Sequence, residues 1–290
     1  MKCKCGKKAI YFDKVICEKH FLEYYTKKVS GTISKFRLFQ KDDRIAVAVS
    51  GGKDSLSAIH VLSKLNYNVT ALAVDEGIFG YREHTLKTLK QFCANYGITL
   101  KIYSFKEEFG TTLDKMHNSS NKCTTCGVLR RYILNKYSRG YDVLVTGHNL
   151  DDEAQAVLMN LFKNNLSILA RLGPVSGQNR LDKFTKRVKP LYYCYEEENI
   201  IYSVLNKFSV DFKECPYIAY SFRAKVRNLL NTLEEKYKGT KQNIIDNFLS
   251  ILPELKENSI CKSFTYCKKC GDPSANEICN ACALLLKLNK

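Results

Sequence analysis

Apolar runs alternate with amphipathic stretches through the middle of the chain. Residues 44–49 are almost continuously aliphatic, which is typical of a strand buried on both faces of a parallel sheet. Further strands are predicted at 69–74, 99–103 and 142–146, and helices at 54–65 and 82–96. Because strand and helix alternate, the pattern predicts an α/β fold built on a doubly wound parallel sheet.

The flanking segments have less regular patterns. An amphipathic helix is predicted at 26–43, a basic and irregular stretch at 163–191, a helical region from 221 to about 251, and a linker at 253–263. The first 25 residues contain too little apolar material for a core of their own. We therefore expect an N-terminal metal-binding knuckle (1–25), an α/β domain (26–252) and a C-terminal ribbon (253–290).

The first strand runs directly into a loop with two glycines and then into a helix. The loop residues are Ala48, Val49, Ser50, Gly51, Gly52, Lys53, Asp54 and Ser55. Consecutive glycines allow a tight turn, and the helix N-terminus after them favours an anion, so such a loop cradles phosphate. It is not a Walker A loop, which has four residues between its first glycine and Gly-Lys-Ser/Thr. The alternative is a simple turn capped by Ser50.

Ligands of parallel sheets bind beyond the carboxyl ends of the strands, so the residues at these ends are expected to meet. Backbone groups around Val74 are placed to read an adenine edge, and Gly147 allows close approach to a ribose. Asp152 could hold magnesium or orient a reacting base. For the pair Asp151 and Asp152, the simpler alternative is that they cap the N-terminus of the following helix.

Charge indicates the kind of partner. The formal net charge is +17 and the pI is near 9.2, which favours a polyanion such as a nucleic acid. Arg223 and Arg227 lie one turn apart, where they could clamp phosphates or simply form a solvated basic face. Neither a membrane-spanning run nor an N-terminal apolar leader is visible, so a cytoplasmic location is expected.

Thirteen cysteines are many for a reducing compartment, and their spacing indicates metal sites rather than disulfides. One set of four soft or borderline ligands opens the chain and another closes it. The first set is Cys3, Cys5, Cys17 and His20, and the second is Cys267, Cys270, Cys279 and Cys282. Four ligands of this kind suit tetrahedral zinc in a structural role, so two zinc ions are expected.

A third group is internal. Cys123 and Cys126 open a predicted helix, and by themselves they fit a redox pair, half of a zinc site or cluster ligands. Cys215 supplies a third thiol, and three thiolates suit an iron–sulfur cluster with one iron unprotected. The remaining cysteines, Cys93, Cys194 and Cys261, read as ordinary small apolar residues.

Ser50 to Ser55 resembles the phosphate loop of the PP-loop ATP pyrophosphatases, which have an adenine nucleotide α-hydrolase-like fold. The ordered set of motifs over nearly the whole chain resembles the tRNA 2-thiouridine synthetases of the TtuA/NcsA group. This resemblance implies ATP as substrate, tRNA as partner, adenylation of the uridine C2 oxygen, a 4Fe–4S cluster on the three internal cysteines and a homodimer. It also implies roles beside the nucleotide for Lys53, Asp152 and Arg130. Arg130 departs from the lysine of some members.

Several alternatives stay open. The resemblance favours wobble uridine 34 over uridine 54, and the sulfur donor could be sulfide or a sulfur-carrier protein. A cysteine-persulfide mechanism without a cluster is also compatible, with Cys123 or Cys126 attacking and Cys215 resolving. Cytidine 2-thiolases share the loop and cluster but lack these flanking knuckles. A zinc-ribbon RNA-binding module without catalysis would need the nucleotide loop to be only structural.

Overall fold

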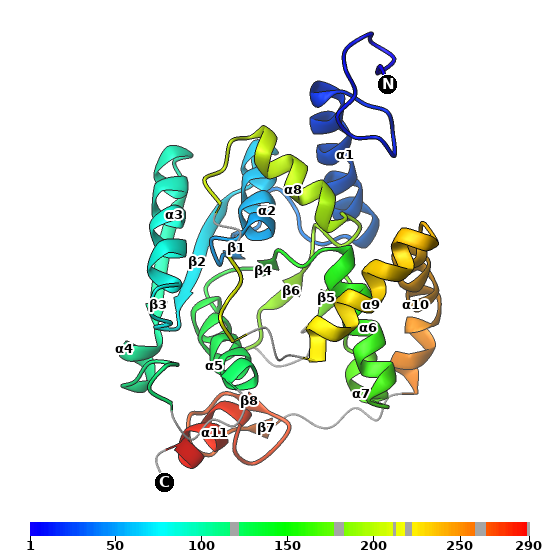
Figure 1. Ribbon diagram of the computed structural model, residues 1–290. Helices are drawn as coiled ribbons and strands as arrows, with labels where there is room; N and C mark the ends of the chain where they lie inside the picture. Colours follow the sequence, from blue (N-terminus) through cyan, green and yellow to red (C-terminus); the bar gives the residue numbers. More distant parts are fainter. Residues whose placement is uncertain (117–121, 177–182, 211–212, 218–221, 259–264, 289–290) are drawn as a thin grey trace.

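A six-stranded sheet forms the centre of the computed structural model, which describes residues 1–116, 122–176, 183–210, 213–217, 222–258 and 265–288 (Figure 1). The strands are β1 (Ile45–Ala48), β2 (Val69–Asp75), β3 (Thr99–Ser104), β4 (Val143–Thr146), β5 (Val175–Ser176) and β6 (Lys186–Val188). Their order is β3-β2-β1-β4-β6-β5. All neighbours are parallel except β5, which pairs antiparallel with β6. The α/β fold with a mainly parallel sheet is confirmed.

The two outer strands correct one prediction. The stretch 163–191 was expected to be irregular, but it contains β5, β6 and the short helix α7 (Leu166–Leu169). β5 has two residues and β6 has three, with the sequence Lys-Arg-Val. Neither strand contains an apolar run from which it could have been predicted. Residues 177–182 of this stretch lie outside the described part of the chain.

Alternate residues of the central strands face opposite layers. Ile45 and Val47 belong to a core shared with helices on one face, whereas Ala46 and Leu72 belong to a smaller cluster on the other. The first layer is formed by α1 (Glu18–Phe36), α2 (Lys53–Lys64), α3 (Arg82–Asn95) and α8 (Glu196–Leu205), and the second by α5 (Lys122–Tyr137). Both faces of the sheet are therefore covered, as expected for doubly wound folds.

A third group of helices lies on the side of the sheet where β5 forms the edge (Figure 1). It comprises α6 (Leu150–Phe162), α9 (Phe222–Lys236) and α10 (Thr240–Glu257), which share one apolar cluster. The linker predicted at 253–263 is wrong for residues 253–257, because Pro253 lies inside α10. Leu252 before it is buried in the shared cluster, so packing holds the helix through the proline. Residues 259–264 lie outside the described ranges.

The first helix also begins earlier than predicted. It was expected at 26–43 but spans Glu18–Phe36, so it crosses the expected boundary at residue 25. Phe21 and Tyr25 are fully buried in the main core, and this packing fixes the first turns of the helix onto the sheet domain. The helix ends where Arg37 adopts a left-handed conformation with φ of +46°.

The two cysteine-rich ends lie at opposite sides of the molecule (Figure 1). The C-terminal ribbon, with β7 (Thr265–Tyr266), β8 (Pro273–Ser274) and α11 (Asn280–Leu288), packs on α5 and near the short helix α4 (Phe105–Phe109). The N-terminal knuckle packs through α1 on α8. Among the described residues, no helix combines the length and hydropathy that crossing a bilayer requires.

Candidate active site and metal centres

The phosphate loop is held in shape by its own hydrogen bonds. Gly51 has a φ of +89°, and a Cβ there would lie 2.5 Å from the carbonyl oxygen of Thr85, so only glycine fits. The hydroxyl of Ser55 donates to the carbonyl of Gly52 at 2.9 Å and accepts from the Ser50 N–H at 3.2 Å. Ser55 is buried and organises the loop, whereas Ser50 is exposed.

Lys53 is the first residue of α2, and its ammonium already contacts carboxylates. Its Nζ lies 2.7 Å from Oε1 of Glu196 and 3.1 Å from Oδ2 of Asp54. Burial lowers the pKa of Lys53, but the two carboxylates outweigh it and the net shift is upward. The lysine is therefore a fixed positive charge at the mouth of the loop.

Asp54 is anchored by amide side chains from two other helices. Its Oδ1 accepts from Nδ2 of Asn199 at 2.8 Å and from Nδ2 of Asn149 at 3.0 Å. The Tyr25 hydroxyl of α1 donates to Oδ1 of Asn199 at 2.6 Å. The carboxylate is thus held from α1, α8 and the N-cap of α6, and Asn199, which no motif in the sequence singles out, is part of the site.

Arg82 is a second residue that the sequence did not point to. Its guanidinium is almost fully buried and donates to the carbonyl of Val74 at 2.9 Å and to that of Ser50. It also pairs with Oε2 of Glu76 at 3.0 Å. Because these carbonyls end β1 and β2, Arg82 ties the phosphate loop to the neighbouring strand end. In the sequence it looks like an ordinary charge at the start of a helix.

Two predicted nucleotide contacts have structural partners of their own. Val74 is buried and its carbonyl is occupied by Arg82, so its predicted role in reading adenine stays a prediction. At Gly147 a Cβ would lie 2.9 Å from the amide nitrogen of Ser55. The loop after β4 therefore presses against the N-terminus of α2, and this close packing by itself requires glycine there.

Asp152 caps its own helix and faces the site. Asn149 and Asp152 form a capping box, with the Asp152 N–H donating to Asn149 Oδ1 at 2.9 Å. Burial and then the charge of Asp54 raise the pKa of Asp152 to about 7, while Arg223 lowers it. Nη1 of Arg223 lies 3.5 Å from its Oδ1. The N-cap is therefore Asn149 and not an aspartate, although Asp152 does take part in the capping box, as its N3 residue. A carboxylate of this kind could also hold a cation.

His148 marks the electrostatic character of this edge of the sheet. Nδ1 of its ring and the hydroxyl oxygen of Thr146 are hydrogen-bonded at 2.9 Å. Surrounding protein and then nearby cations lower its pKa to about 3, so the ring is neutral. The cations, in order of effect, are Lys189, Arg223, Arg130 and Arg187. Four positive side chains thus act electrostatically on this edge, and an anionic ligand would be attracted to it.

The three internal cysteines lie near one another: Cys126 and Cys215 pack on one apolar cluster, and the Cys123 thiol contacts the segment that carries Cys215. Cys123 and Cys126 stand on the first turns of α5, and Cys215 comes from the segment after the sheet. Burial raises the pKa of all three thiols, that of Cys126 to about 12, and the three groups act on one another electrostatically. The Cys123 thiol donates to the carbonyl of Tyr217 at 3.0 Å.

This thiol group fits an iron–sulfur cluster. Such clusters are held by cysteine thiolates, and all three cysteines are half-buried, with Cys126 and Cys215 among apolar side chains. They are not drawn together as tightly as ligands of a single ion, unlike the two terminal sets. Arg130, one turn after Cys126, lowers the pKa of that thiol and pairs with Oε1 of Glu76 at 3.6 Å. Glu76 therefore bridges Arg130 to Arg82, and so joins the thiols to the phosphate loop.

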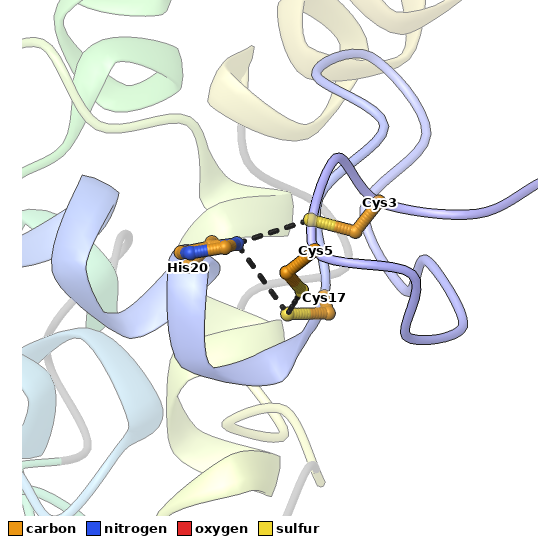
Figure 2. Close-up of side chains that lie close together, drawn as sticks. All are labelled: Cys3, Cys5, Cys17 and His20. Carbon is orange, nitrogen blue, oxygen red and sulfur yellow. Dashed lines mark hydrogen bonds between the residues drawn. The ribbon is translucent and has the colours of Figure 1, made fainter.

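The N-terminal set forms a closed metal-binding group (Figure 2). The ligand atoms of Cys3, Cys5, Cys17 and His20 all lie within 4.8 Å of one another. Nδ1 of His20 is 3.0 Å from Sγ of Cys3, and Cys5 Sγ is 3.6 Å from Cys17 Sγ. The N–H of Cys5 lowers the pKa of Cys3 most, to about 6, which favours the thiolate that a metal needs.

The C-terminal set is equally closed. Sγ atoms of Cys267, Cys270, Cys279 and Cys282 also lie within 4.8 Å of one another. Burial raises the pKa of Cys267, but backbone N–H donors, including that of Cys279 at 3.2 Å, bring it down to about 6. Both terminal sets can hold a metal, as predicted.

Other predicted residues have internal partners. Arg227 pairs with Glu214 at 2.6 Å, and Arg223 reaches Gln155 at 3.3 Å, so a phosphate clamp stays a prediction. Cys93 and Cys194 are buried, as expected for apolar residues. Cys261 lies outside the described part of the chain.

The fold and loop define a PP-loop protein, and a family model described as a PP-loop domain matches residues 20–231. Within this family the chain belongs with the tRNA 2-thiolation proteins. The tRNA-5-methyluridine(54) 2-sulfurtransferase of Pyrococcus horikoshii is 41% identical over 97% of this chain and 93% of its own. Cytoplasmic tRNA 2-thiolation protein 1 of Drosophila ananassae is 34% identical over 100% of this chain and 88% of its own.

A solved structure agrees with this assignment. The U34-tRNA thiolase NcsA from Methanococcus maripaludis, determined with its [4Fe-4S] cluster, is 36% identical and superposes with a TM-score of 0.85. The match covers 98% of this chain and 95% of that one. Similarity therefore extends through both cysteine-rich ends and not only through the PP-loop domain.

Proposed function

We propose that the protein replaces the C2 oxygen of a tRNA uridine by sulfur in an ATP-dependent reaction. One observation carries the proposal: a PP-loop and a three-cysteine site lie at the same end of the sheet. Arg82 and Arg130, joined by Glu76, link the two. A reaction that uses both ATP and sulfur needs both sites within reach of one atom of substrate.

The PP-loop serves the first half of the reaction. The uridine oxygen attacks the α-phosphorus of ATP, and pyrophosphate leaves. Lys53 and the loop amides oppose the negative charge that grows on the departing phosphates. Lys53 exchanges its contact with Glu196 for phosphate when ATP binds. Asp152, with its raised pKa, would hold magnesium or orient the base, and Ser50 is the exposed hydroxyl of the loop.

The cysteine site serves the second half. Sulfide adds to C2, and AMP leaves with the former uridine oxygen, so the base gains one sulfur. Cys123, Cys126 and Cys215 would hold a 4Fe–4S cluster, whose fourth iron supplies a place for sulfide when the cluster is bound. Arg130 is placed to attract the anionic sulfide or the adenylate. Zinc in the two terminal sets would stabilise the parts that flank the cleft.

A persulfide on one of the same cysteines is the alternative for sulfur delivery. Burial raises the pKa of all three thiols and Arg130 lowers it, and these shifts act equally on both routes, because a persulfide nucleophile and a cluster ligand both need the thiolate. We propose the cluster first because the similar NcsA structure was determined with its [4Fe-4S] cluster. Only the cluster route requires iron, so iron dependence of thiolation distinguishes the two.

Two uridines remain candidates within tRNA. The structural similarity to a U34 thiolase supports the wobble position, which we propose first. The 41% identity to a 2-sulfurtransferase for methyluridine 54 supports the second. Sulfide or a sulfur-carrier protein would be the donor and the cytoplasm the location, and a homodimer, which the resemblance implies, would be the active form.

Mass spectrometry of tRNA fragments tests this proposal. A strain that lacks the gene should lose 2-thiouridine from position 34 and regain it with the wild-type chain but not with Cys126→Ala. Loss confined to position 54 would assign the other uridine. Unchanged thiolation at both positions in the deletion strain would refute the function itself.

A further inference from the structure

The loop between β2 and α3 forms one wall of the cysteine site. Glu76, at its start, pairs with Arg130 and raises the pKa of Cys126. Tyr81, at its end, lies close enough to Cys215 for that thiol to raise the pKa of the tyrosine, second to burial. The tip of this loop is Phe79, whose side chain is 85% exposed. A large aromatic ring is therefore exposed at the tip of the loop that lines the cysteine site.

The backbone beneath this ring is fixed. Gly77 and Gly80, on either side of the tip, both have φ of +68°, and the intervening Ile78 is buried. The Phe79 N–H donates to Oδ2 of Asp114 at 2.8 Å. These contacts fix the backbone at the loop tip, and the Phe79 side chain is exposed on this fixed backbone.

The same carboxylate ties the ring to the cysteines. Oδ1 of Asp114 accepts from the Tyr217 hydroxyl at 2.7 Å, and the carbonyl of Tyr217 accepts from the Cys123 thiol at 3.0 Å. One acidic side chain thus couples the Phe79 tip to the segment that carries Cys215. Phe79 is consequently placed relative to the reacting centre and not only relative to the surface.

The proposed reaction indicates which kind of ligand an exposed aromatic ring could contact here. A uridine that reacts at C2 must leave its base stack to enter a cleft. Proteins that hold unstacked bases provide aromatic faces, together with cations for the phosphates. Four cations act electrostatically on His148, which follows β4 at the same end of the sheet. An exposed aromatic ring combined with such cations suits the recognition of a splayed nucleobase.

We propose that Phe79 stacks on an unpaired base of the tRNA, either the target uridine or its neighbour, and so fixes the target at the cysteine site. This inference rests on the proposed thiolation of tRNA. It assigns a substrate contact outside both the nucleotide loop and the metal-binding residues.

Kinetics of substituted proteins test the stacking. Phe79→Ala should lower kcat/KM for tRNA about ten- to hundredfold, the range expected for one lost base–aromatic stack. Phe79→Tyr should restore most of it, and iron content and ATP affinity should not change. Tyr237→Ala, at a 68% exposed tyrosine at the end of α9, is the matched control and should behave like the wild type.

A direct readout is available because the sequence contains no tryptophan. Phe79→Trp creates a single fluorophore at the loop tip, and saturating tRNA should quench it strongly, whereas Tyr237→Trp should hardly respond. Undiminished kcat/KM in Phe79→Ala, or no quenching in Phe79→Trp, would overturn the stacking while thiolation by the wild type stands. If Phe79→Ala lost its oligomeric state in light scattering, the ring would be a subunit contact instead. A wild type without thiolation would refute the proposed function separately.

Discussion

Lys53 and Asp54 show what single residues of the loop contribute. The sequence motif predicted that both residues belong to a phosphate-binding loop, and the structure adds the contacts that hold their side chains. Asp54 keeps two amide donors, Asn149 and Asn199, that do not depend on Lys53. The carboxylate of Asp54 would therefore stay in position if the lysine were removed.

Replacement of Lys53 by alanine should consequently separate catalysis from folding. We expect thiolation to fall about 10²- to 10³-fold, as for removal of one group that stabilises transition-state charge, with a thermal midpoint close to that of the wild type. Release of AMP and pyrophosphate during tRNA turnover is the measurement. Near-normal turnover in Lys53→Ala would show that the loop amides suffice.

Residues whose role depends on tertiary packing could not be found from the sequence. Arg82 reads as a helix-surface charge, yet it binds the carbonyls that end two strands. Glu196 and Asn199 lie about 140 residues beyond Lys53 and Asp54, their partners. The sequence contains no periodicity or motif that connects positions so far apart, because only the fold brings them together.

His60 gives a pH dependence at the residue scale. Burial among aromatic rings lowers its pKa to about 4, whereas an unfolded histidine titrates near 6.5. Between these values the unfolded chain takes up a proton that the native state does not, so stability falls as the pH falls. From pH 7.5 to 5 the wild type should lose about 2 kcal/mol more than His60→Phe in urea titrations. Equal losses would mean that His60 is protonated in the folded protein.

Elements with strong patterns were predicted to within about one residue. The aliphatic strands β1 and β2 and the helices α2 and α3 lie where their periodicity placed them. The start of α1, the short outer strands and the last turn of α10 were missed, because packing of a few side chains outweighs weak local signals.

The two terminal metal sites should differ in their effect on the cleft. The C-terminal ribbon shares an apolar cluster with α5, which carries Cys123 and Cys126, whereas the N-terminal knuckle packs on α1. We expect Cys279→Ser to lose the ribbon metal and much of the cluster iron, because α5 loses its support. Cys5→Ser should lose the knuckle metal but retain the iron. The measurement is the metal content of both variants. Equal iron content in the two would contradict a coupling between the C-terminal ribbon and the cluster site.

At the scale of the whole molecule, charge and topology act together. The net charge of +17 predicted a polyanionic partner, but only the structure gathers cations around His148 at the end of the sheet that carries the loop and the thiols. The sequence also could not tell which cysteine-rich end lies beside that cleft. It is the C-terminal one, because α11 packs on α5.

The central claim is that one cleft couples ATP cleavage to sulfur transfer through a cluster on Cys123, Cys126 and Cys215. The most direct test is an anaerobic reaction of cluster-loaded protein with unmodified tRNA, ATP and sulfide, followed by mass spectrometry of the nucleosides. We predict one 2-thiouridine per AMP and pyrophosphate released, and none from the iron-free protein or from any of the three Cys→Ala variants. Thiolation at the full rate by aerobically purified, iron-free protein would contradict the claim and establish the persulfide route.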